Sequence, residues 1–73
     1  MAKYTVRFQI NGTWHLTRGE STYPTKELVE NDSVDNYIIE EIAFEFIKSY
    51  KELCQIDGEV NHRTLTFEYT LED

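Results

Sequence analysis

The residues best suited to chemistry in this chain are two histidines and one cysteine, His15, His62 and Cys54. Histidine serves most often as a metal ligand or as a general acid or base. His15 and His62 fall on the polar side of two different predicted strands, roughly 10 Å apart if a third strand lies between them. One metal ion cannot bridge that gap without further ligands. We therefore expect solvated histidines, with a polar binding face as the alternative, and no metal site.

Cys54 lies near the end of a predicted helix, and no sequence feature identifies a group that would activate its thiol. A partly buried, structural thiol is therefore expected. The chain also lacks a phosphate-binding glycine loop, GxSxG, HExxH and a calcium-binding loop. These absences predict a protein that is not an enzyme and uses no cofactor. A single cysteine cannot form an internal disulfide, which favours a reducing, cytoplasmic location.

A different kind of candidate site lies on the longest predicted element, a helix from Ser33 to about Gln55 with Asp32 or Ser33 as its N-cap. Tyr37 and Phe44 are seven residues apart, so they share one face of this helix. That face lies opposite the apolar stripe, which consists of Ile39, Ile42, Ala43, Phe46, Tyr50 and Leu53. The predicted protein-binding residues are Tyr37, Glu40, Glu41, Phe44, Glu45 and Lys48.

The two aromatic residues on this charged face have two main interpretations. In the first, the connecting segment 19–32 folds back and covers them with Tyr23 or Leu28. In the second, they anchor a partner protein or a second copy inside a charged rim. Exposed aromatics without a role are the third possibility. The sequence leaves these alternatives open.

Three segments of alternating polarity must form the sheet that supports this helix. Residues 3–10, 13–18 and about 59–71 alternate with period two, as strands do. Thr25 can cap a short helical turn that runs through Glu30. A right-handed crossover from the second strand places the third strand beside the first. The predicted fold is α+β, ββαβ, with an antiparallel sheet of order 2-1-3 and one long helix on one face, in a single domain spanning residues 1–73.

The connection between the first two strands determines which residues face the helix. A two-residue loop, Asn11-Gly12, would send the apolar residues of the two strands to opposite faces. A three-residue loop that also includes Ile10 pairs Phe8 with Trp14 and keeps the apolar residues together. We therefore predict the three-residue loop.

Charge restricts the class of partner. Fourteen acidic residues against seven basic ones give a net charge of -7, which argues against direct binding to nucleic acid or to an anionic membrane. Residues 20–59 hold eleven of the acids and three of the bases, so the predicted helix and the segment before it carry the negative excess. Such a surface either keeps the protein soluble or complements a basic surface on a partner protein.

The leading hypothesis is a protein-binding module that inhibits a partner by engaging its basic, nucleic-acid-binding surface. In its size, acidity and lack of enzyme motifs the chain resembles small phage-encoded inhibitors, including anti-CRISPR and anti-restriction proteins. That resemblance implies carboxylates that stand in for phosphates. The alternative hypothesis is a structural or assembly protein that forms a homodimer through its helix face or the edge of its third strand.

Overall fold

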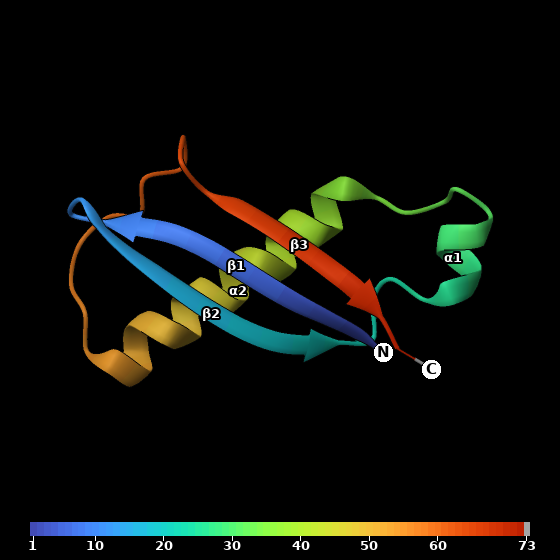
Figure 1. Cartoon of the computed structure of the whole chain (residues 1–73), viewed down its shortest axis with the longest axis horizontal. Coiled ribbons are helices and arrows are strands. Elements are labelled where there is room, and N and C mark those ends of the chain that lie inside the picture. The colour runs from blue at the N-terminus through green and yellow to red at the C-terminus, as the bar shows by residue number, and fades with distance from the viewer. Residues whose placement is uncertain (73) are drawn as a thin grey trace.

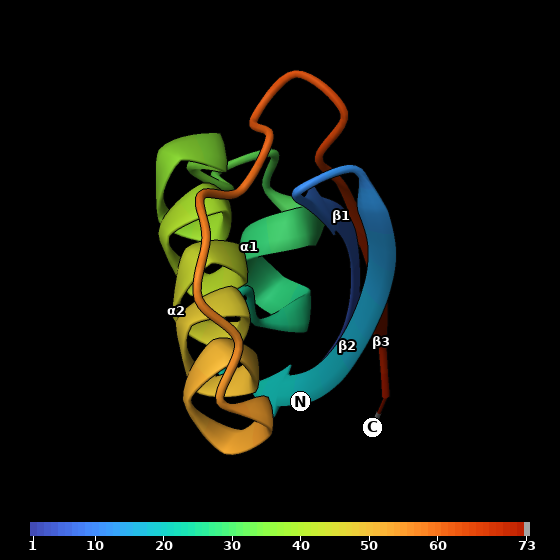
Figure 2. The same ribbon diagram turned by 90° about the vertical axis from the view of Figure 1, so that its left-hand side faces the viewer.

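The computed structural model of the chain describes residues 1–72. It contains the strands β1 (Ala2–Ile10), β2 (Thr13–Ser21) and β3 (Thr66–Leu71) and the helices α1 (Lys26–Glu30) and α2 (Asn36–Cys54). The strands form one antiparallel sheet in the order β2-β1-β3, and α2 crosses one face of it (Figures 1 and 2). The predicted α+β, ββαβ fold with strand order 2-1-3 is confirmed.

The core lies between β1 and α2. Because β1 is the central strand, its inward side is flanked by two strands and covered by the helix. Every second residue of β1 is buried, and the helix contributes one residue per turn. The buried apolar residues are Ala2, Tyr4, Val6, Phe8, Ile10, Ile39, Ala43 and Ile47. The alternate apolar residues of β1 pack against an apolar stripe along α2, as the sequence pattern predicts.

The connection between β1 and β2 differs from the prediction. Ile10 pairs directly with Thr13, so the loop has two residues, and both Asn11 (φ 52°) and Gly12 (φ 81°) are left-handed. Asn-Gly is the pair best suited to this turn, whose twist matches that of the flanking strands. The three-residue loop was therefore wrong. The preference of the turn prevails over the burial of the apolar residues of β2.

The shorter loop turns β2 over relative to the prediction. Phe8 pairs with His15 and Gln9 pairs with Trp14. Side chains on directly opposed residues share a face, so Trp14 and Leu16 lie on the open side of the sheet, where they are 53 % and 39 % exposed. The inward side of β2 is instead polar or small, with His15, Thr17 and Gly19 beneath the helix.

Helix α2 begins later than predicted. Asp35 is the N-cap, and its carboxylate accepts a hydrogen bond of 2.9 Å from the backbone N–H of Tyr37, so neither Asp32 nor Ser33 caps the helix. At the other end Gln55 is left-handed and closes the helix. Leu53 was predicted in the apolar stripe but is 85 % exposed. The last turn of α2 extends past β2, beyond the reach of the core (Figure 1).

The predicted short helical turn is confirmed, whereas the predicted third strand is too long. Thr25 caps α1 by accepting a hydrogen bond from the backbone N–H of Leu28, as predicted. Strand β3 covers only Thr66–Leu71 instead of residues 59–71. The carboxamide of Asn61 accepts a hydrogen bond from the backbone N–H of Arg63 and stabilises a turn that interrupts the strand. A single bridge between Ile10 and Val60 remains from the expected longer pairing.

Candidate functional site

The predicted protein-binding residues lie together on the solvent side of α2. We call Tyr37, Glu40, Glu41, Phe44, Glu45 and Lys48 the acidic helix surface. All of its side chains are exposed. Tyr37 is 66 % exposed and Phe44 is 40 % exposed, so both aromatic rings are accessible on a helix whose opposite side buries Ile39, Ala43 and Ile47.

The segment between β2 and α2 does not cover Tyr37. Tyr23 instead packs against the buried cluster of Ala2, Tyr4 and Ile39. The hydroxyl of Tyr4 donates to the backbone carbonyl of Tyr23, and the hydroxyl of Tyr23 accepts a hydrogen bond of 2.7 Å from the backbone N–H of Asp35. Tyr23 thereby ties β1 to the start of α2, and the interpretation in which it shields Tyr37 is wrong.

Phe44 is partly covered, but by a different segment from the one predicted. Its ring meets the ring of His62 edge to face, at a centroid distance of 5.4 Å and an angle of 86°. The sequence pattern placed His62 in the third strand. In the structure it lies in the turn before β3 and is not part of the sheet. A shallow groove between α2 and this segment continues from Phe44; it is lined by Phe44, Ile47, Lys48, Lys51, Val60 and His62 among others.

The acidic helix surface forms no salt bridge with any other part of residues 1–72. Among residues 1–72 the single salt bridge joins Lys3 to Glu72 at 3.1 Å, on the far side of the sheet. Glu40, Glu41 and Glu45 therefore have no salt-bridge partner within residues 1–72. Glu41 and Glu45 are one helical turn apart, which is mildly unfavourable for the helix. The helix thus carries unpaired negative charge around two exposed aromatic rings.

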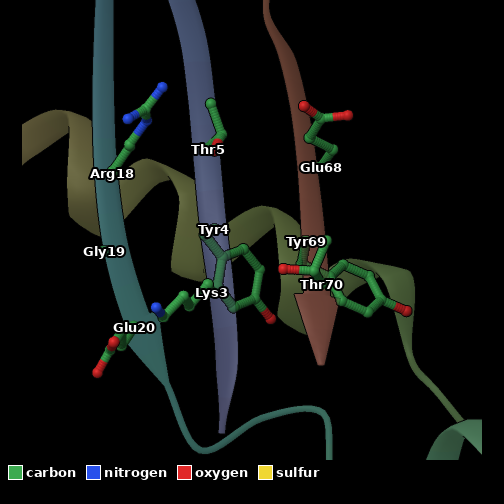
Figure 3. A pocket seen from close by; sticks show the side chains of 9 residues that line it. All are labelled: Lys3, Tyr4, Thr5, Arg18, Gly19, Glu20, Glu68, Tyr69 and Thr70. Carbon is green, nitrogen blue, oxygen red and sulfur yellow. The ribbon is translucent and has the colours of Figure 1, made fainter. Parts of the chain in front are cut away.

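The open face of the sheet carries mixed charge. Figure 3 shows its hollow, where Arg18, Thr5 and Glu68 project from β2, β1 and β3. Lys3, Glu20 and Thr70 complete the rim nearer the other end of the strands. Positive and negative groups alternate here, so this face lacks the single sign of charge that distinguishes the acidic helix surface.

The residues with the most reactive side chains, the two histidines and the cysteine, lie in different parts of the structure. His15 faces inward and lies between Phe8 and Tyr50, with its Nδ1 atom 3.0 Å from the hydroxyl of Tyr50. It is therefore not the solvated sheet histidine that was predicted, because β2 is turned over. Burial raises the pKa of Tyr50, and the neighbouring thiol of Cys54 raises it further. Cys54 itself is exposed, contrary to the expectation of a partly buried thiol.

Comparisons with known proteins leave the surface to be interpreted from its own chemistry. No family model, curated protein or solved structure matches this chain. Within residues 1–72 no three His, Cys, Asp or Glu side chains are grouped so that they could hold a metal ion. Over the same residues no helix is long and apolar enough to cross a membrane.

Sequence reasoning missed one feature near this surface. The groove beside Phe44 depends on the turn at Asn61–Thr64, which the alternating pattern of residues 59–71 concealed. Asn61 was the available signal, because an asparagine side chain favours turns over the interior of a strand.

Proposed function

We propose that the chain is a non-enzymatic, cytoplasmic protein-binding module whose acidic helix surface engages a basic surface of a partner protein. One observation carries the proposal: Tyr37 is 66 % exposed on a well-packed helix, among glutamates that have no salt-bridge partner within residues 1–72. Exposed aromatic anchors inside a charged rim are typical of protein interfaces. Tyr37 and Phe44 supply the apolar contact, and the glutamates supply charge complementarity.

The partner class follows from the sign of the charge. A surface that carries clustered carboxylates attracts lysine- and arginine-rich surfaces, and many such surfaces normally hold nucleic acid. By occupying one of them the chain would act as a competitive inhibitor, with carboxylates in the place of phosphates. This mode of action corresponds to that of small phage-encoded anti-CRISPR and anti-restriction proteins, to which the chain is similar in size and acidity.

The test is affinity capture from lysate of the native host at low salt, followed by elution in a salt gradient. The wild type is compared with the triple variant Glu40→Gln, Glu41→Gln and Glu45→Gln. We expect the wild type to retain a protein that elutes as salt rises, and the triple variant to lose it. A duplex DNA oligonucleotide added to the beads should displace the captured protein, because both compete for its basic surface.

A matched control variant distinguishes an effect of where the glutamates lie from an effect of the net charge of the protein. The variant Glu20→Gln, Glu27→Gln and Glu68→Gln removes the same number of charges from exposed sites outside α2. It should retain the partner as the wild type does. Equal loss in both triple variants, or capture that salt does not weaken, contradicts binding through the acidic helix surface.

A further inference from the structure

The outer edge of β2 is long and regular. All nine of its residues pair with β1 without a bulge, and the strand contains no proline. Within residues 1–72 its backbone makes no hydrogen bond to any backbone group outside the pairing with β1. Natural sheets protect such edges with charges, prolines, bulges or a covering segment. β2 carries charges only in its second half, at Arg18 and Glu20, whereas its first half places Trp14 and Leu16 on the open face beside this edge.

The turn determines which backbone groups are free. In a two-residue hairpin loop the flanking residues, Ile10 and Thr13, exchange both hydrogen bonds, and bonded and non-bonded pairs then alternate along the ladder. The N–H and C=O groups that point away from β1 therefore belong to Trp14, Leu16, Arg18 and Glu20. Their side chains all lie on the open face of the sheet. Any antiparallel strand added here must align its open-face residues with these four.

We propose that a second copy of this chain pairs with the first through β2, antiparallel, about a two-fold axis at Leu16. The two three-stranded sheets then form one continuous sheet with both α2 helices on the same side. In this register Leu16 meets Leu16 of the second copy, and Trp14 meets Arg18 of the second copy on either side of the axis. Thr13 through Gly19 of each copy take part in the ladder.

Electrostatic complementarity favours this register. The guanidinium of Arg18 has no salt-bridge partner within residues 1–72 and lies beside an exposed hollow. Opposite Trp14 it can lie over the indole ring, which attracts cations more strongly than any other side-chain ring. The interface forms two such contacts, related by symmetry, and buries the apolar side chains between them. A two-fold axis at Arg18 would instead oppose two like charges.

The neighbouring symmetric registers are poorer. An axis at Thr17 places Trp14 opposite Glu20, a carboxylate that gains nothing from the face of an aromatic ring. An axis at His15 pairs only Thr13 to Thr17 and leaves Arg18 beyond the strand of the second copy. An axis at Thr17 would pair the whole strand but lacks the aromatic–cation contact. The axis at Leu16 pairs more of the strand than the axis at His15 does, and it alone of the three brings Trp14 opposite Arg18.

The helix side of the molecule supports the same arrangement. The last turn of α2 extends past β2 on the side away from β1, and Leu53 in that turn is 85 % exposed (Figure 1). Leu53 follows Phe46 and Tyr50 along the side of the helix that packs on β2. A strand added beside β2 would lie beneath this overhang. The pairing thus accounts for Trp14, Leu16 and Leu53 through a single interface.

Cysteine cross-linking tests both the pairing and its register. In a Cys54→Ser background, Leu16→Cys places two thiols on Cα atoms about 5.5 Å apart, within the range of a disulfide. We expect a covalent dimer on mild oxidation. Trp14→Cys alone should form no covalent dimer, because the two positions are about 14 Å apart across the axis. A mixture of Trp14→Cys chains with Arg18→Cys chains should form the mixed dimer.

Sedimentation velocity over a concentration series tests the association without cross-links. Leu16→Lys opposes two like charges at the axis and should weaken dimerisation by at least about tenfold. Thr66→Lys adds the same charge to the open face on β3, at the opposite side of the sheet from β2, and should leave dimerisation unchanged. Circular dichroism confirms that both variants are folded. A wild type that stays monomeric up to millimolar concentration, or cross-linking of Leu16→Cys with Arg18→Cys in place of the predicted pairs, overturns the proposal.

Salt distinguishes this pairing from binding through the acidic helix surface. Dimerisation brings two acidic helices to one side of the joined sheet, so added salt should strengthen it by screening their repulsion. Capture of a basic partner should weaken under the same change. The triple glutamine variant on α2 should therefore dimerise more tightly while losing the partner, and either result can fail without the other.

Discussion

Strands β1 and β2 have the same length and the same alternation of polar and apolar residues, yet they use it in opposite ways. β1 buries its apolar residues beneath α2. β2 turns Trp14 and Leu16 outward and places His15, Thr17 and Gly19 against the helix. The difference arises in the two residues between the strands, since Asn11 and Gly12 fix the register of the whole hairpin.

This contrast shows that alternation and orientation are separate pieces of information. Period two identifies a strand, but the choice of face depends on the turn and on what the opposite layer can accommodate. Gly19 illustrates the second condition. A Cβ atom at this position would lie 2.5 Å from the ring of Phe46, so α2 approaches β2 closely because β2 has little side-chain bulk on its inward side.

The largest effect in this comparison is expected for Gly19→Val. Valine favours strands, but here its side chain would overlap the ring of Phe46, which packs against both buried clusters. Overpacking of this kind costs about 1–3 kcal/mol of the free energy of unfolding, more than the propensity of valine returns. Urea denaturation measures the loss.

The adjacent residue is the control for that substitution. Arg18→Val introduces the same side chain on the open face, where no helix lies over it. Its effect on the free energy of unfolding should stay within about 0.5 kcal/mol in the monomer. A comparable loss in the two variants would contradict the inward placement of Gly19.

The sequence predicted the strand order, the central place of β1 and the position of the long helix, because each depends on a periodicity that extends over many residues. It also placed Tyr37 and Phe44 outside the core. The orientation of β2 could not be predicted from hydrophobic pattern, since the turn opposed the pattern. The position of His62 was missed for a similar reason, because the side-chain hydrogen bond of Asn61 interrupts an otherwise regular alternation.

A smaller effect is expected on the inward side of β1. Tyr4→Phe removes the hydroxyl that donates to the carbonyl of Tyr23 and should cost about 1–1.5 kcal/mol at neutral pH. Burial raises the pKa of Tyr4 above its ordinary value of 10.0, and the neighbouring hydroxyls of Tyr69 and Tyr23 raise it further.

The direction of the pH dependence follows from that shift. Folding favours the neutral phenol, so the contribution of Tyr4 is complete below pH 10.0 and is lost as the pH rises through the higher pKa of the folded state. The wild type should therefore lose more stability than Tyr4→Phe between pH 9 and pH 11, as measured by urea denaturation at each pH. Parallel losses in the two proteins would contradict the role of Tyr4.

The smallest loss of stability is expected for substitution of the tryptophan, Trp14. Its size distinguishes the two possible registers of β1 with β2. With the two-residue turn Trp14 lies on the open face, so Trp14→Thr should cost less than about 1 kcal/mol in dilute, monomeric protein. With a three-residue loop the same residue would belong to the core, and its removal would cost about 3–5 kcal/mol. Far-UV circular dichroism must monitor unfolding, because the substitution removes the tryptophan fluorescence. A loss of several kcal/mol would restore the orientation that the hydrophobic pattern alone predicts. It would also remove Trp14 and Leu16 from the open face, where the pairing of two copies needs them.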